Sequence, residues 1–120
     1  MRAGRPLALA LGVALGAGCV SDMTDQLDDE PCPPESELTY ANFGGAFFDD
    51  NCQRCHASAS DDRNGAPSSF TFDTADDVRD HRERIFARAA ASNTSMPPGP
   101  DDPPDEEREM LAEWLACGAP

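Results

Sequence analysis

Two cysteines and a histidine stand together in the segment CQRCH, residues 52–56. Cysteines at i and i+3 lie on one side of a helical turn, where each thiol can add to one of the two vinyl groups of a haem. His56, directly after the second cysteine, is then directed at the iron as its proximal ligand. Cys52, Cys55 and His56 therefore form the attachment signature of one covalently bound c-type haem.

Two other uses of a Cys-x-x-Cys pair fit this chain less well. A structural zinc site needs a second pair of ligands, and only His81 and two distant cysteines remain. A thioredoxin-like redox pair is typical of a βαβ pattern, which is absent around the motif. The motif favours haem attachment.

Residues 1–18 have the pattern of an export signal, with two arginines at the start and an apolar run over residues 7–17 that is too short to span a bilayer as a helix. Small residues then precede Cys19, which resembles the processing site of a bacterial lipoprotein, where the cysteine becomes the lipid-bearing N-terminus. That family usually has leucine at the third position before the cysteine, whereas this chain has Gly16 there and Leu15 one position earlier. Ordinary signal cleavage is the alternative, and both routes take the chain into the cell envelope, where such a haem is attached.

Cys32 and Cys117 are left once the lipid and haem positions are assigned. In an oxidising compartment two leftover cysteines suggest a disulfide. They lie near the two ends of the mature chain, so a bond between them would clasp the domain. Two free thiols are the alternative.

Acidic residues dominate the charge of the chain. There are 23 Asp and Glu against nine cationic residues, all of them arginine, and the formal net charge is −14. Such a surface repels nucleic acid and anionic membranes, and it favours a basic partner protein through salt-dependent steering. Solubility alone is the simpler explanation for most of these residues.

Composition divides the mature chain into a tether and one domain. Residues 19–37 are acidic and proline-rich with almost nothing apolar, which predicts a lipidated linker. The single domain is expected to run over residues 38–120, with apolar stripes at helical spacing. Helices are expected over residues 38–50, 74–91 and 104–117. The predicted class is all-α.

Local signals mark the ends and the packing of these helices. Thr74 with Asp77 resembles an N-terminal capping pair, and Gly118 is placed to end the last helix. Gly44 and Gly45 weaken the first helix intrinsically, but they permit close packing against another helix.

In this order the elements resemble a class I c-type cytochrome. An aromatic helix leads into the Cys52–His56 motif, and a methionine in the proline-rich segment 92–104 precedes a last helix that bears an aromatic residue. The likeness is closest to small mono-haem cytochrome c domains of bacterial lipoproteins that end in a Trp-Leu-x-Cys-Gly-like segment, here residues 114–118. The resemblance implies a small fold in which the expected helices wrap around one covalently bound haem c.

The iron of such a haem needs an axial partner opposite His56. The resemblance implies Met96, in the loop before the last helix, and a thioether favours ferrous iron and raises the reduction potential. Met110 is expected to pack as a helix residue, and His81, whose neighbours are charged, is the alternative ligand that would lower the potential. The resemblance also implies that Pro67 accepts a hydrogen bond from the proximal histidine through its carbonyl.

These residues imply an electron carrier and not an enzyme, because two filled axial positions leave no open site for small molecules. The chain would dock a basic redox partner from a lipid-anchored position on the membrane, on its own or as a subunit of a larger oxidoreductase. One alternative is a haem-based sensor or peroxidase-like enzyme with an open sixth site. Another is a non-haem lipoprotein whose cysteines form structural disulfides.

Overall fold

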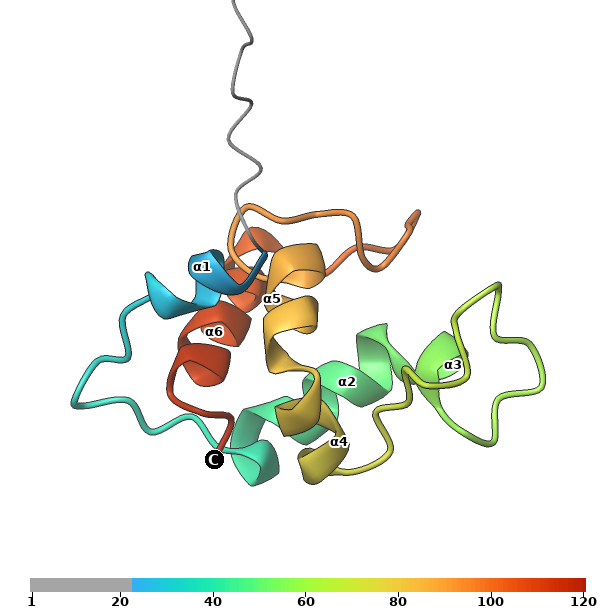
Figure 1. The fold of residues 1–120 in the computed structure, drawn as a ribbon, viewed down its shortest axis with the longest axis horizontal. Helices are drawn as coiled ribbons and strands as arrows, with labels where there is room; N and C mark the ends of the chain where they lie inside the picture. The colour runs from blue at the N-terminus through green and yellow to red at the C-terminus, as the bar shows by residue number, and fades with distance from the viewer. Residues whose placement is uncertain (1–22) are drawn as a thin grey trace, which may run out of the picture.

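The computed structural model describes residues 23–120, so the expected export signal at residues 1–18 and the lipid-bearing Cys19 lie outside the described residues. Over the described range the chain is helical and has no strand, which confirms the all-α prediction. Its elements are α1 (Met23–Asp28), the π-helix η1 (Tyr40–Gly44), α2 (Gly45–Asn51), α3 (Gln53–His56), α4 (Ala75–Asp80), α5 (Arg82–Ala89) and α6 (Asp105–Ala116) (Figure 1). No helix in this part of the chain is long and apolar enough to cross a membrane.

The core is built around Trp114 of α6, whose side chain is fully buried. Two phenylalanines meet its ring edge-on, Phe43 of η1 at 6.1 Å between centroids and Phe48 of α2 at 6.3 Å. Gly44 permits this approach, because a Cβ placed on it would lie 2.5 Å from the indole ring. The close packing expected at this glycine is confirmed.

The predicted helix over residues 74–91 is two helices, because it breaks at His81. The backbone N–H of His81 bonds the carbonyl of Val78 at 3.1 Å, one residue short of its α-helical partner. That partner, the carbonyl of Asp77, contacts the imidazole Nδ1 of His81 at 2.9 Å instead. A side-chain donor thus replaces a backbone donor, and α5 starts afresh at the next residue.

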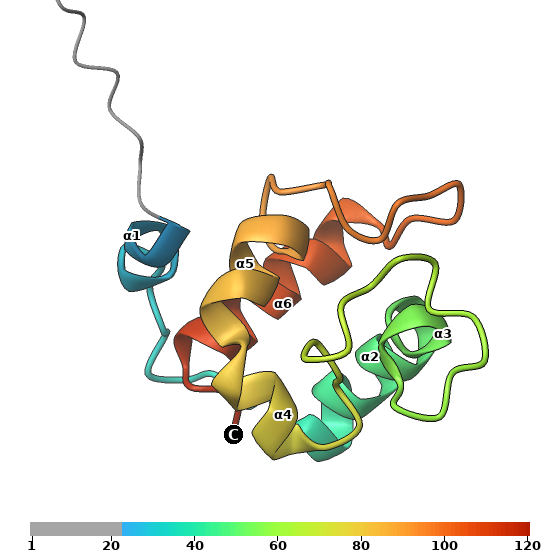
Figure 2. The ribbon, with the colours of Figure 1, turned by 45° about the vertical axis from the view of Figure 1, so that its right-hand side comes forward.

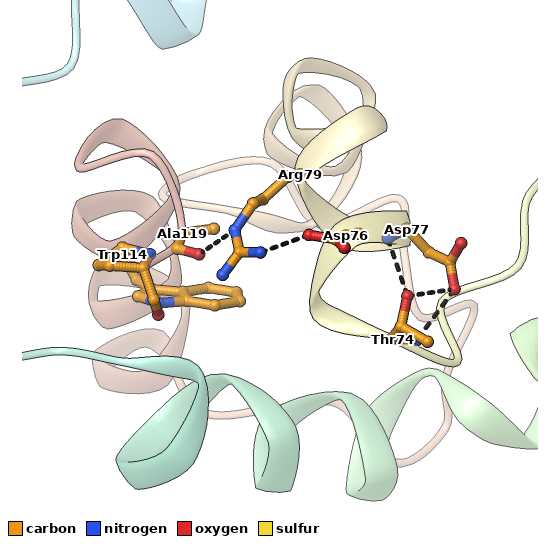
Figure 3. A network of polar contacts seen from close by, with 7 residues as sticks. Thr74, Asp76, Asp77, Arg79, Trp114 and Ala119 are labelled. Atoms are coloured by element: carbon orange, nitrogen blue, oxygen red, sulfur yellow. Dashed lines mark hydrogen bonds and ion pairs between the residues drawn. The ribbon is translucent and has the colours of Figure 1, made fainter.

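The start of α4 carries the predicted capping pair, which Figure 3 shows. Thr74 Oγ1 accepts from the N–H of Asp77 at 3.2 Å, and the Asp77 carboxylate accepts from the N–H of Thr74 at 2.9 Å. Further along the helix, Arg79 pairs with Asp76 at 2.6 Å. The Arg79 Nε donates to the carbonyl of Ala119 at 2.9 Å. This last bond joins α4 to the C-terminal segment that follows α6.

A glycine and a disulfide close the end of α6. Gly118 has a φ of +90°, and the next N–H, of Ala119, bonds the carbonyl of Trp114 at 2.9 Å. This is the turn expected of a glycine that follows a helix. Cys117 is bonded to Cys32, with 4.9 Å between their Cα atoms. The segment before η1 is thereby fixed to the last helix.

Composition predicts a linker over residues 19–37, but part of this segment folds onto the domain. Helix α1 packs against α5 and α6, as Figures 1 and 2 show. Leu27 is 5% exposed, and Gln26 accepts a hydrogen bond from Asn93 at 3.0 Å. The buried Leu27 and the nearby Cys32 disulfide fix this segment to the domain, although its average composition is that of a linker.

Candidate haem-attachment site

The Cys52–His56 motif lies where α2 ends and α3 begins. Cys52 closes α2 through a bond from its N–H to the Phe48 carbonyl at 2.8 Å. Its own carbonyl accepts from the N–H groups of Cys55 and His56, at 3.1 and 2.9 Å. One helical turn therefore carries both thiols and the imidazole. Both thiols are partly buried and unpaired, which is the state that addition to two haem vinyl groups requires.

The ring of His56 is held on two sides. Its Nδ1 lies 2.8 Å from the carbonyl oxygen of Phe70, and its plane stacks on Phe72 with 4.6 Å between centroids. A carbonyl can only accept, so Nδ1 carries the proton and donates. In the neutral ring Nε2 is then left with a free lone pair, the form in which an imidazole binds a metal. The residues present therefore fit a c-type haem.

The carbonyl that orients His56 belongs to Phe70, so the role expected of Pro67 is wrong. The carbonyl of Pro67 accepts from Arg63 Nη2 at 2.9 Å. The loop returns to the motif further on, where the N–H of Phe72 bonds the carbonyl of His56 at 3.0 Å. A backbone carbonyl has no side-chain signature, and the spacing therefore selects the wrong residue. The signal in the sequence is the apolar pair Phe70 and Phe72 in a polar stretch.

Burial raises the pKa of the Cys52 thiol to about 12. The positive charge of Arg108 opposes this rise in the pKa, and the neighbouring Cys55 adds to it. The thiol is therefore protonated at neutral pH and is a poor nucleophile.

Arg108 of α6 holds the loop that carries Met96. Arg108 is 1% exposed. Its Nη1 donates to three carbonyls, those of Ala89 at 2.8 Å, Asn93 at 3.1 Å and Met96 at 2.8 Å. The N–H of Met96 bonds the carbonyl of Arg88 at 2.8 Å. The backbone of Met96 is fixed in this way, while the residue remains 40% exposed.

The motif and the methionine loop lie toward the same end of the molecule, as Figures 1 and 2 show for α3 and the segment 92–104. Arg108 bonds the carbonyl of Met96 through its Nη1, and its positive charge opposes the rise in the pKa of Cys52. The same buried guanidinium thus holds the methionine loop and acts electrostatically on one thiol of the motif.

The two other candidate ligands take part in packing. The ring of His81 is partly buried against Phe70 at 4.8 Å and Phe72 at 5.9 Å between centroids, so its charged neighbours do not place it on the open surface. Its Nδ1 donates to the carbonyl of Asp77 in α4 at 2.9 Å. Met110 is partly buried on α6 and packs against the core, as expected.

An attachment turn with two free thiols and an oriented imidazole, set in a small all-α fold, defines a c-type cytochrome domain. Residues 41–115 match the family described as cytochrome C oxidase, cbb3-type, subunit III, and the chain belongs to this family. The match runs from η1 into α6 and includes both the motif and the methionine loop. None of the curated proteins and none of the solved structures matches the chain. Such domains use haem c for electron transfer.

Proposed function

We propose that the protein is a mono-haem electron carrier in which Cys52 and Cys55 hold haem c through two thioethers. His56 and Met96 are its axial ligands. The observation that carries this proposal is the 2.8 Å contact of the His56 Nδ1 with a backbone carbonyl, because it leaves Nε2 as the metal-binding atom. When bound, haem supplies one-electron exchange at its iron.

The residues of the chain set the potential and keep the ligands in place. A thioether opposite an imidazole stabilises ferrous iron and raises the potential. Arg108 fixes the backbone of Met96 through the bond to its carbonyl at 2.8 Å. With both axial positions filled, small molecules have no open coordination site. This supports electron transfer over catalysis by this chain alone.

The acidic surface favours a partner protein with a basic surface. A formal net charge of −14 favours brief docking of a basic redox protein, and salt screens this attraction. The partner is another electron-transfer protein or a larger oxidoreductase of which this chain is a subunit. The sequence pattern before Cys19 supports export to the cell envelope and a lipid anchor at that cysteine, on the periplasmic or outer side of a membrane.

Intact mass after maturation with the haem-attachment machinery tests the attachment. We expect one added haem, and a Cys52→Ser, Cys55→Ser double variant should carry none. The Cys32–Cys117 disulfide should remain in both proteins and serves as the internal control for an oxidising compartment. Wild-type protein that matures without haem would instead support a non-haem lipoprotein.

The ferric absorbance spectrum tests the axial ligands. We expect a low-spin spectrum with a sulfur-to-iron charge-transfer band, which Met96→Ala abolishes and Met110→Ala leaves in place. A high-spin ferric spectrum of the wild type would contradict ligation by Met96. It would favour a sensor or peroxidase-like enzyme with an open sixth site.

A further inference from the structure

Arg63, in the loop between α3 and α4, is partly buried and uses its guanidinium on backbone carbonyls alone. Its Nη1 donates to Ala57 at 2.8 Å and its Nε to Ala66 at 3.3 Å. Its Nη2 donates to Pro67 at 2.9 Å and to Phe70 at 3.1 Å. Neither ion pair found among the described residues involves Arg63. In a chain this acidic, an arginine directed only at carbonyl oxygens is a specific arrangement.

One of these carbonyls also serves the proximal histidine. The oxygen of Phe70 lies 2.8 Å from His56 Nδ1 and 3.1 Å from Arg63 Nη2. A carbonyl oxygen has two lone pairs and can accept both bonds. The charged donor draws electron density from the oxygen, since charge-assisted bonds are the stronger ones. The same oxygen is therefore a weaker acceptor for the proton of His56.

The strength of that acceptor controls how much negative charge the imidazole offers to a bound metal. A strong acceptor on Nδ1–H gives the ring imidazolate character and raises its basicity toward the metal. A more basic ligand stabilises ferric over ferrous iron and lowers the reduction potential. A weakened acceptor has the opposite effect.

We propose that Arg63 is a positioning residue that tunes the proximal ligand. Through the carbonyl of Phe70, it limits the charge that His56 passes to the iron and so raises the reduction potential. This inference rests on the proposed attachment of haem at Cys52 and Cys55 and on ligation by His56.

The test distinguishes tuning of His56 from two other roles of Arg63, which are stabilising the loop and supplying a positive charge near the haem. Arg63→Met removes all the donors and keeps an unbranched side chain, whereas Arg63→Lys keeps the positive charge and one donor group. Arg54→Met is the matched charge control, because Arg54 is an exposed arginine within the motif itself. Each protein is matured with haem, reduced, labelled with nitrogen-15 and studied by NMR, and its potential is measured.

We expect the Nδ1–H proton of His56 in Arg63→Met to shift downfield and to exchange more slowly with water. The potential should fall further than in Arg54→Met, whose Nδ1–H resonance should stay in place. Arg63→Lys should lie between Arg63→Met and the wild type, and it decides the question if Arg63→Met does not mature.

An Nδ1–H resonance that stays in place or moves upfield with faster exchange overturns the proposal, because it shows either no coupling or only a lost loop contact. Wild-type protein without covalent haem would overturn the proposed function itself. Wild-type protein with one haem and an unmoved resonance in the variants overturns only the tuning role.

Discussion

Replacement of Arg108 by methionine tests how the methionine loop is held. Arg108 is 1% exposed, and its Nη1 donates to three carbonyls at 2.8, 3.1 and 2.8 Å. Its Nη2 lies 3.5 Å from the carboxylate of Asp102. Methionine can fill the space of the arginine stem, but it leaves all three carbonyls without this donor.

The expected loss of stability follows from two opposing effects. A hydrogen bond from a charged group contributes about 1.5–3 kcal/mol, so the two N–H groups of Nη1, shared among three carbonyls, are a large term. Methionine, however, avoids the desolvation of a buried cation, which costs several kcal/mol in its own right. We therefore expect Arg108→Met to lower the free energy of unfolding by about 3–5 kcal/mol. Small domains have about 5–15 kcal/mol in total, so the effect is severe.

Guanidinium chloride unfolding of the matured protein, followed by circular dichroism, measures this loss. Arg79→Met is the matched control, because Arg79 is half-exposed and bonds one carbonyl and one exposed aspartate. Its loss should be about 1 kcal/mol or less. In Arg108→Met the charge-transfer band of Met96 should also disappear at lower denaturant than the helical signal. An unfolding free energy within about 1 kcal/mol of the wild type would refute the reasoning.

Three further predictions concern the core, the motif and the surface. Gly44→Ala should cost about 1–3 kcal/mol of unfolding free energy by thermal or chemical denaturation, because its Cβ would meet Trp114. Gly45→Ala should change little, since the gain in helix propensity offsets its milder contact. In the haem-free Cys55→Ser variant, alkylation of Cys52 at pH 8 should be about 50-fold slower in the folded protein than in the unfolded protein, because the raised pKa of Cys52 favours the thiol over the reactive thiolate. The rate in the folded protein should increase toward pH 12. Equal rates in the two states would contradict the burial of Cys52. Electron transfer with a basic partner should slow as salt is added in stopped-flow experiments, and a salt-independent rate would exclude steering by the acidic surface.

Side-chain chemistry at fixed spacing was the part of the site that sequence could predict. The haem-attachment residues can be predicted because each role requires one particular side chain, as for Cys52, Cys55 and His56. The helical class follows from the apolar stripes. The carbonyl of Phe70 could not be predicted in the same way, since any residue supplies a carbonyl and the return path of the loop selects it. The burial of Arg108 could not be predicted either, because the residue lies in an acidic segment that is typical of a surface.

Two elements differ from their predictions for equally local reasons. The stripe over residues 74–91 has helical spacing throughout, but the imidazole of His81 occupies the carbonyl that would continue the helix. Helix α1 forms in a segment whose composition is that of a linker, because Leu27 has a buried place to occupy. In both cases the contacts of one side chain determine the local structure against the prediction from the surrounding sequence.

The absorbance spectrum of the matured protein, recorded oxidised and reduced, tests the central claim most directly. The account predicts a low-spin haem that is reduced and reoxidised reversibly, with the sulfur-to-iron charge-transfer band in the ferric form. Those features together require a bound haem with a methionine sulfur on its iron, and loss of the band in Met96→Ala assigns that sulfur to Met96. A high-spin ferric spectrum, or no haem absorbance at all, would contradict it.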